Sequence, residues 1–379
     1  MINKVYTFLL FRFHLNLIML FTLLLGCMIP IAGYSQSAQM DTWVSINSQI
    51  YGAKPDDSGQ LGGGPNYSEY FTKGDYEPKD LDGLIEALSK AKPGEIVFIP
   101  DENEIDLTTY IYIDQFVLEI PEGVTLAGNR GYQDSKGAIL LSDALKTPMM
   151  IKALGPNVRI TGLRIQGPNG KRYMAHHHKS FQPGGPRHKY YYKLPVSTGI
   201  ITSYPKLEVD NCDISAFSHS AIRLKDGDSH HIHHNYIHHC QYNGLGYGIS
   251  HSKASSIIEF NLFDNNRHSI AGTGQPGCSY IARHNVELGV SLSHCFDMHG
   301  GGDRNDGTII AGTDIEIYNN TFRAPQFAIG IRGEAENKCD IYQNWFVPHK
   351  EMKQAVRPYP YKSPNVFNNV YGKEPVQSK

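Results

Sequence analysis

The residues best suited to chemistry are histidines and arginines gathered between positions 266 and 332. Two short strings, NRH at 266–268 and FDMH at 296–299, each place a histidine close to a charged side chain. Histidine transfers protons near neutral pH, and arginine binds a carboxylate through two parallel hydrogen bonds. Removal of a proton α to a carboxylate needs such a cation, a base and a proton donor. The residue types therefore favour a functional site over a merely solvated face or a set of surface salt bridges.

The elements that must position these residues follow from a repeat marked by asparagine. Its members are Asn211, Asn235, Asn261, Asn285, Asn320, Asn344 and Asn369. The intervals are 24, 26, 24, 35, 24 and 25 residues, and the long step contains the insertion GGGDRNDGTIIAGTD. A period in this range indicates a repeat architecture, and short alternating strands with Gly and Asn turns make each unit β.

Each repeat is therefore predicted to form one coil of an all-β, right-handed parallel β-helix, a solenoid that grows by adding coils. We expect the recurring asparagines to stack at one corner of the coils, as structural residues outside any functional site. A β-sandwich with fortuitous asparagine spacing is the alternative.

Aligning the second strand of each coil predicts which side chains face outward. The strands are AIRLKD (221–226), YGISH (247–251), SIAGTG (269–274), CFDMHG (295–300), AIGIRG (328–333) and AVRPY (355–359). Alternation along each strand places the apolar residues inside and leaves two outward columns. The first column is Arg223, Gly248, Ala271, Asp297, Gly330 and Arg357. The second column is Lys225, Ser250, Thr273, His299, Arg332 and Tyr359. Since coils stack about 4.8 Å apart, the columns should form a groove floored by small residues.

Roles within this groove follow from the chemistry. We expect His299 to act as base or acid with His268 as its partner, and Asp297 to orient a histidine or an arginine. The expected catalytic residues are His268, His299, Arg267, Arg332 and Asp297. The expected substrate-binding residues are Lys225, Arg223, His251, Thr273, His294, Arg304 and Tyr190. No metal ligand is assigned, and Ca²⁺ would need acids supplied by turns because the strands carry no carboxylate cluster.

Two insertions interrupt the coils, at 168–195 and at 300–314. The first mixes cations with aromatic rings, and carries His176 to His178, Arg187, His188, and Tyr190 to Tyr192. Such a loop could bind an anionic glycan, with rings on sugar faces and cations on carboxylates, or could be simply solvated. A three-histidine metal site is disfavoured because adjacent histidines on an irregular loop rarely converge on one ion.

The first 35 residues are typical of a secretory signal, with Lys4 and Arg12 before a long apolar run. Anchoring through a lipid on Cys27, and an uncleaved anchor, are the alternatives. We expect a secreted or periplasmic protein with one domain at 36–379. Its cap and first coils should occupy 41–150, and its regular coils 151–370. Leu81, Leu84, Ile85 and Leu88 lie at helical spacing, which predicts a short helix closing the open end of the coils.

The cap also carries a specific resemblance. The strings YGAKPDD, PGEIVFIP and VTLAG, with the helix between the first two, resemble the N-terminal cap and first coils of the pectate-lyase-like superfamily of right-handed β-helix proteins. The resemblance covers about Ile46 to Gly131. It implies a secreted carbohydrate-active fold, whose members include lyases, hydrolases, epimerases and phage spike proteins. FDMH and NRH are also similar to the FDPH and RH strings of alginate C5-epimerases, although Met298 replaces proline and the order of the strings is reversed.

We therefore expect a polysaccharide lyase that cleaves a uronate-containing glycan by β-elimination. A uronate C5-epimerase is one alternative. A glycoside hydrolase is another, although it needs two carboxylates and Asp297 is the only acid in either column. A non-catalytic glycan-binding protein is the alternative of a different class. The expected partner is an anionic polysaccharide, bound by a monomer with no membrane contact beyond the signal segment.

Composition narrows these possibilities. Without Lys4 and Arg12 the chain has 33 Lys and Arg against 37 Asp and Glu, a formal charge of −4 that does not favour nucleic acid. Five cysteines follow residue 35 and form no CxxC pair, which favours buried free thiols over disulfides or a zinc site.

Overall fold

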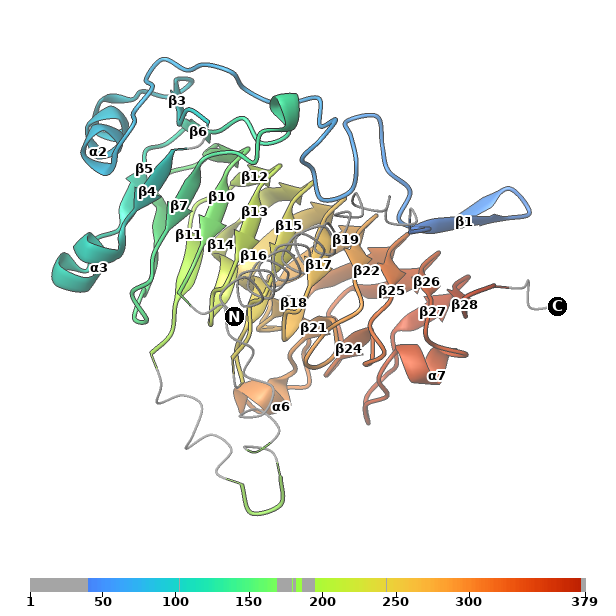
Figure 1. The fold of residues 1–379 in the computed structure, drawn as a ribbon. Coiled ribbons are helices and arrows are strands. Elements are labelled where there is room, and N and C mark those ends of the chain that lie inside the picture. Colours follow the sequence, from blue (N-terminus) through green and yellow to red (C-terminus); the bar gives the residue numbers. More distant parts are fainter. Residues whose placement is uncertain are drawn as a thin grey trace, which may run out of the picture. The chain divides into compact units, whose positions relative to one another are not determined.

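Short parallel strands wind around a common interior in successive coils (Figure 1). The computed structural model describes residues 40–101, 103–168, 179, 182–185, 195–242 and 244–375. Residues 42–379 form one compact unit. Among the described residues, no helix is both long enough and apolar enough to cross a bilayer. The expected signal segment and most of the first insertion lie outside the described residues.

The parallel strands form three faces of the coils, and two long strands join the first and second faces into one sheet. The first face contains β5 (Leu118–Ile120), β8 (Ile151–Ala153), β11 (Thr198–Thr202), the first half of β14 (Ser220–His233), the first half of β16 (Tyr247–Glu259), β18 (His268–Gly272), β21 (Phe296–Met298) and β24 (Ile329–Ile331). The second face contains β3 (Ile96–Phe98), β6 (Thr125–Ala127), β9 (Arg159–Thr161), β12 (Glu208–Asp210), the second halves of β14 and β16, β19 (Ser279–Arg283), β22 (Asp314–Tyr318), β25 (Lys338–Tyr342) and β27 (Asn365–Phe367). The third face contains β4 (Glu104–Asp106), β7 (Ile139–Leu141), β10 (Arg164–Gln166), β13 (Asp213–Ser215), β15 (Tyr236–His238), β17 (Leu262–Asp264), β20 (Val286–Glu287), β23 (Thr321–Phe322), β26 (Trp345–Phe346) and β28 (Val370–Tyr371).

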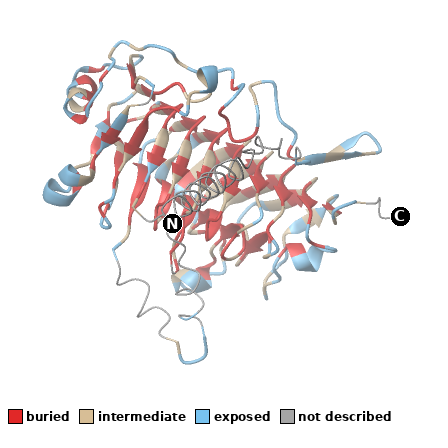
Figure 2. Cartoon of the chain, in the orientation of Figure 1, coloured by how far each residue is buried: buried red, intermediate tan, exposed pale blue. Residues whose placement is uncertain are grey.

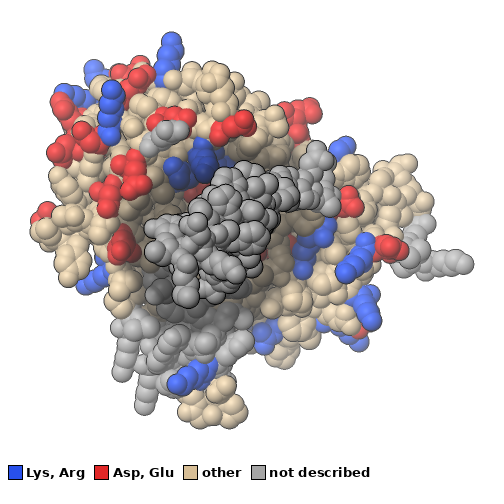
Figure 3. All heavy atoms as spheres, viewed as in Figure 1, with Lys and Arg blue, Asp and Glu red and all other residues tan. Residues whose placement is uncertain are grey.

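Alternation along these strands fills the interior with apolar side chains. One continuous cluster of buried residues runs from Leu81 to Val356, and Figure 2 shows the buried colour following the strands through the stack. Aromatic rings also stack from coil to coil inside, as where Phe322 and Phe346 lie 5.2 Å apart. The outer surface carries both signs of charge, and on the face in Figure 3 acidic side chains gather at the end that bears α2 (Leu81–Lys90).

The asparagine ladder occupies the corner between the second and third faces, as expected. From Asn235 to Asn369, each amide Nδ2 donates to the Oδ1 of the next asparagine at 3.0 Å. The residue before each ladder asparagine takes positive φ, for example 51° at His234 and 55° at Phe260. Asn211 is the exception, because it occupies the left-handed position itself (φ 52°) and Cys212 takes the ladder position. The first step of the predicted ladder is therefore offset by one residue.

The cap helix forms as predicted. Asp80 begins α2 by accepting a hydrogen bond from the Gly83 amide at 2.8 Å, and the helix packs against β3 and β5 at the end of the stack. A second helix, α3 (Thr108–Asp114), was not expected, because its sequence TTYIYID is rich in strand-forming residues. Of its side chains only Ile111 is buried, so the segment lies on the surface rather than in a sheet.

An N-terminal strap, residues 51–67, follows the hairpin of β1 (Trp43–Ile46) and β2 (Gln49–Gly52) and crosses the coils in reverse order, as the blue trace in Figure 1 shows. Successive hydrogen bonds join Tyr51 to Asn368, Gly52 to Gln343, Ala53 to Thr321, Gly62 to Phe260, and Tyr67 to Asp210. The strap therefore contacts coils from the last one back to an early one.

One register differs from the expected alignment. Ser250 lies between Arg223 and Ala271, where Gly248 was expected, so the coil at 247–251 is displaced by two residues. The cause is that β14 and β16 run unbroken from the first face to the second, with no turn to mark where one strand ends. The next coils agree with the alignment, since Ala271, Asp297 and Gly330 are register partners.

Candidate active site

A pocket of about 550 Å³ is lined by residues that precede or follow three strands of the first face, β18, β21 and β24. The residues that line it are Arg267, Ser293, His294, Gly302, Asp303, Arg332, Arg357, Tyr359, Pro360 and Tyr361. The insertion at 300–314 contributes Gly302 and Asp303 through the short helix α6 (Gly301–Arg304). Beyond α7 (Met352–Ala355), the segment 357–361 forms another part of the wall. The pocket therefore combines three coils with the insertion at 300–314 and the segment 357–361.

Asp297 is the centre of the polar contacts. Its carboxylate is fully buried and binds Arg332 in bidentate fashion, with Nε to Oδ1 at 2.8 Å and Nη2 to Oδ2 at 2.9 Å. His294 Nε2 lies 2.6 Å from Oδ1, and His299 Nε2 lies 2.9 Å from Oδ2. Burial alone would raise the pKa of Asp297, but Arg332 and the histidines outweigh it and hold that pKa well below its usual value. Asp297 is therefore ionised and orients its neighbours.

His294 lies on the floor of the pocket. Its short contact to Asp297 assigns the proton to Nε2, so Nδ1 keeps its lone pair on the side of Ser293, whose Oγ is 3.5 Å away. Burial lowers the pKa of His294, although Asp297 opposes the shift. Gly330 makes room for the ring, because a Cβ there would lie 2.8 Å from His294 Cδ2. The ring is thus neutral and held in place.

His268 lies behind His294 and does not line the pocket. Its Nδ1 donates to the backbone carbonyl of His294 at 2.5 Å, and the two rings lie 4.3 Å apart. Burial, reinforced by Arg267, lowers the pKa of His268 far below its usual value. Its Nε2 has no hydrogen-bond partner among the described residues. His268 can therefore position His294, but it does not reach a molecule in the pocket directly.

Three arginines make the pocket cationic. Arg267 is 9% exposed and stands 5.9 Å from the Tyr247 ring, and its Nε and Nη1 find no acceptor among the described residues. Arg332 is already bound by Asp297 and by Asp303, at 3.1 Å. Arg357 lies over the ring of Tyr359 at 5.3 Å, and burial raises the pKa of that phenol. The three guanidinium groups that line the pocket suit an anion.

The other expected site residues lie elsewhere. His251 points into the interior, where Nε2 contacts Ser256 Oγ at 2.7 Å, so it is not available to a ligand. Arg304 is held within the insertion by Asp306 and by the carbonyls of Thr273 and Ile310. Arg223 and Lys225 lie on β14, three coils from β21. Tyr190 lies outside the described residues.

Sequence reasoning did not select Arg357, Tyr359 and Tyr361 as site residues, although the first two stood in the predicted columns. The predicted columns could have identified the first two. The Arg357 amide donates to the Ile329 carbonyl, which places Arg357 next to Gly330 in the first column, as the alignment predicts. Ser293 and Asp303 had no such signal, since Ser293 lies outside the strands and Asp303 lies in α6.

His268, His294 and Asp297 each offer one ligand atom, all within 4.8 Å of one another. The cluster nevertheless fits a metal ion poorly, because both oxygens of Asp297 are bound by Arg332 and two further arginines line the same pocket. The acids of the insertion are also engaged, Asp303 by Arg332 and Asp306 by Arg304. The charges favour an anionic ligand over a cation.

A family model described as the right handed beta helix region matches residues 155–286. The protein contains a right-handed parallel β-helix. Solved β-helix structures resemble it at low identity. An alginate lyase from Paenibacillus sp. str. FPU-7 shares 12% identity over 78% of this chain and 98% of its own, with a TM-score of 0.41. A family 28 exopolygalacturonase from Yersinia enterocolitica shares 13% identity over 77% of this chain and 62% of its own, with a TM-score of 0.45.

The catalytic unit of a GH87 α-1,3-glucanase from Streptomyces thermodiastaticus strain HF3-3 shares 12% identity over 80% of this β-helix protein and 54% of its own chain, with a TM-score of 0.41. These likenesses concern the fold alone. A comparison with curated proteins found no match.

Proposed function

We propose that this β-helix protein is a polysaccharide lyase that cleaves a uronate-containing glycan by β-elimination at the pocket around Arg332. The observation that carries the proposal is the set of three guanidinium groups, from Arg267, Arg332 and Arg357, that line one pocket together with a neutral, oriented histidine. A sugar carboxylate would be bound by these cations, and their charges would lower the free energy of the carbanion-like transition state.

The proposed step assigns one role to each residue. Nδ1 of His294 takes the proton from the carbon α to the carboxylate, while Asp297 stabilises the imidazolium that forms. The bond from the neighbouring carbon to the glycosidic oxygen breaks, a carbon–carbon double bond forms, and the Tyr359 hydroxyl protonates the departing oxygen. His268 and His299 are positioning residues, the first through the backbone of His294 and the second through Asp297.

Hydrolysis is less well supported by this arrangement. A glycoside hydrolase needs one carboxylate and one carboxylic acid presented to the bond. Asp297 is fully buried beneath Arg332, and Asp303 is bound by Arg332 and by the Gly300 amide. Asp297 does not line the pocket, and Asp303, which does, is the only one of the two acids that a substrate could contact.

The test is ultraviolet absorbance of unsaturated uronate after incubation with alginate, pectate, glucuronan or glycosaminoglycans. Absorbance should rise with one of these substrates, and Arg267→Lys should lower kcat/KM about 10²-fold because lysine cannot reproduce the bidentate contact. Arg164→Lys is the matched control, since Arg164 lies on the third face and its Nε donates to the Gly137 carbonyl. New reducing ends without absorbance would instead mean hydrolysis, altered sugar configuration alone would mean epimerisation, and unaltered glycan would mean binding or no interaction.

The proposed lyase would act outside the cytoplasm, on an anionic polysaccharide. An anionic polysaccharide as substrate agrees with the secretory signal expected at residues 1–35, and with a single enzyme domain at 36–379 acting outside the cytoplasm as a monomer. Detection of the mature chain in the medium or periplasm, starting near residue 36, would test the first part. Light scattering of the purified protein would test the second.

A further inference from the structure

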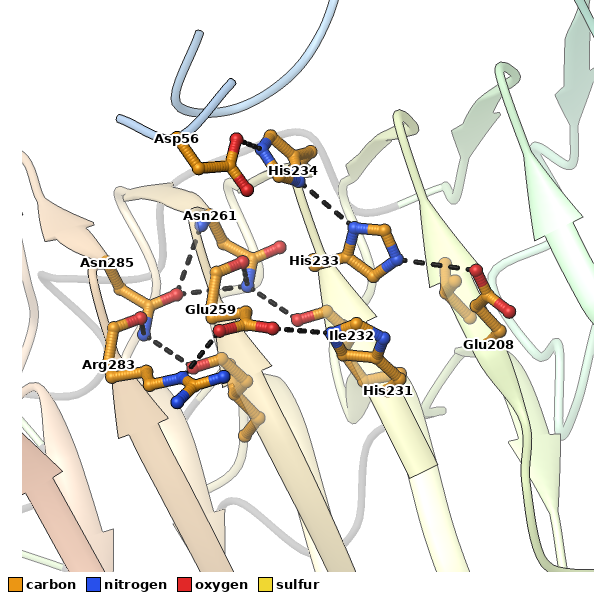
Figure 4. A network of polar contacts seen from close by, with 12 residues as sticks. Asp56, Glu208, His231, Ile232, His233, His234, Glu259, Asn261, Arg283 and Asn285 are labelled. Atoms are coloured by element: carbon orange, nitrogen blue, oxygen red, sulfur yellow. Dashed lines mark hydrogen bonds and ion pairs between the residues drawn. The ribbon is translucent and has the colours of Figure 1, made fainter. Parts of the chain in front are cut away.

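A second cluster of titratable side chains lies on the outer side of the second face, away from the pocket (Figure 4). His231 and His233 are two residues apart on β14, so both point outward. Their neighbours in register are glutamates, Glu208 of β12 beside His231 and Glu259 of β16 beside His233. The pair of histidines therefore stands between two carboxylates from the adjacent coils.

Glu208, His231 and His233 each offer a ligand atom, and the three atoms lie within 4.8 Å of one another. His233 Nε2 is 3.4 Å from Glu208 Oε1, and the two imidazole rings are stacked with centroids 4.0 Å apart. Ligands about 2.0–2.1 Å from a tetrahedral Zn²⁺ lie about 3.4 Å from each other. The distance between His233 Nε2 and Glu208 Oε1 thus matches that between two ligands of one ion, and the third ligand atom lies within 4.8 Å of both.

The remaining nitrogen of each histidine is held by a further residue. Glu259 Oε1 lies 2.7 Å from His231 Nε2, and Arg283 fixes that glutamate through its other oxygen at 2.5 Å. His233 Nδ1 lies 3.0 Å from His234 Nδ1, and His234 Nε2 lies 3.2 Å from Asp56 Oδ1. Figure 4 shows the free nitrogen of His231 on the side of Glu208. Metal-binding histidines are typically oriented in this way, through a carboxylate or polar group on the second nitrogen.

We propose that Glu208, His231 Nδ1 and His233 Nε2 bind a divalent first-row transition-metal ion such as Zn²⁺. Two imidazoles and one carboxylate suit such an ion rather than calcium or magnesium, which prefer oxygen ligands. The fourth position faces solvent, because the side chains of His231 and Glu208 are 40% and 36% exposed. The ion would join β12 to β14.

The surrounding charge permits a cation. Arg159 lies 3.3 Å from Glu208 but is bound in bidentate fashion by Asp210, with both contacts at 2.9 Å. Arg283 is likewise committed to Glu259. The same network contains four acids, namely Asp56, Glu208, Asp210 and Glu259. The acids outnumber the two arginines, so the local charge favours a cation.

The test measures binding of Zn²⁺ and Co²⁺ to the purified, chelator-stripped protein by equilibrium dialysis, with the visible spectrum of Co²⁺ as a second readout. We expect one equivalent of metal, a rise in the unfolding temperature, and at least a tenfold loss of affinity in His233→Ala and in Glu208→Gln. Asp56→Asn, which acts through His234, should weaken binding about 10–100-fold.

His238→Ala is the matched control. Like His233, His238 contacts a neighbouring histidine through Nδ1 and a carboxylate through Nε2, at 2.9 Å from Asp213. The residue two positions before it is Tyr236 rather than a histidine, so no second imidazole completes a site, and His238→Ala should bind metal normally. A triple alanine variant of His176, His177 and His178 should also bind normally.

Three results would overturn the proposal. The first is that neither ion binds stoichiometrically. The second is that His233→Ala and Glu208→Gln bind as tightly as the unaltered protein. The third is that binding is lost in His268→Ala, which would place the ion in the pocket instead. Should His233→Ala fail to fold, Glu208→Gln still decides the question, because that side chain is more than one third exposed.

Discussion

Replacement of Asp297 by asparagine keeps the shape of the side chain and removes its charge. Arg332 then remains largely buried, with only the more distant Asp303, at 3.1 Å, to balance it. Breaking a buried pair by removing one partner costs about 3–5 kcal/mol, because the other charge stays uncompensated. We therefore expect Asp297→Asn to lower the free energy of unfolding by about 3–5 kcal/mol, as measured by denaturant titration. Asp306→Asn, which removes the exposed partner of Arg304, should lower the free energy of unfolding much less.

The double variant Asp297→Asn/Arg332→Met removes both charges and should recover most of this loss. The pH profile gives a second readout. Because the folded-state pKa of Asp297 is lowered, its charge stabilises the fold above the pKa of the unfolded chain, about 3.9, and the contribution fades as pH falls towards the folded value. The unaltered protein should therefore lose stability below about pH 4 faster than Asp297→Asn. A loss below 1 kcal/mol in the single variant, or strictly additive effects in the double one, would refute this reasoning.

Three further changes have defined outcomes. Gly330→Ala should displace the His294 ring and lower kcat about 10–10²-fold, whereas Gly289→Ala, where an added Cβ meets no atom within 4 Å, should not; equal turnover of the two variants would contradict this. Asn285→Ala removes a side-chain amide that donates to the Ile258 and Arg283 carbonyls and to Asn320. This change should lower the free energy of unfolding by about 2–4 kcal/mol. The control Asn337→Ala, at an exposed position, should lower it by less than about 0.5 kcal/mol. Burial raises the pKa of Glu287 to about 8. The folded state therefore keeps a proton that the unfolded chain releases above about pH 4, and the free energy of unfolding falls as pH rises from about 4 to 8. In denaturant titrations, the free energy of unfolding of Glu287→Gln should not show this fall. Relative to the unaltered protein it should therefore rise by about 3 kcal/mol between pH 5 and pH 8. Parallel plots of unfolding free energy against pH for the two proteins would contradict the raised pKa.

Much of the fold could be predicted because each coil of a solenoid repeats the same turns and strands, so the sequence has a regular period. The recurrence of asparagine located the corner of each coil, and alternation located the columns of Asp297 and His299. The method failed where local sequence carries no boundary. Strands β14 and β16 pass from one face to the next without a turn, so the register at Ser250 was displaced. Asn211 kept the period but occupies the neighbouring position of the turn.

The site was harder to predict than the fold, because its residues come from turns as well as strands. Asp297, Arg332, Arg267 and His268 were brought together through coil stacking, which the period encodes. How deep each side chain lies is decided by three-dimensional packing, so the sequence could not show that His268 stands behind His294, or that His251 turns inward to Ser256. Nor could it show that the segment after α7 returns to the pocket wall.

The N-terminal strap changes how such a protein should fold. In a bare solenoid each coil contacts only its neighbours, so folding can start anywhere and the ends can fray independently. Here residues made early bind the last coil, as in the hydrogen bond from Tyr51 to Asn368 across 317 positions. The strap cannot dock until the final coils exist, which adds contacts of very high sequence separation and should slow the last folding step. Once docked, it ties early and late coils into one cooperative unit, so that fraying at one end is resisted from the other.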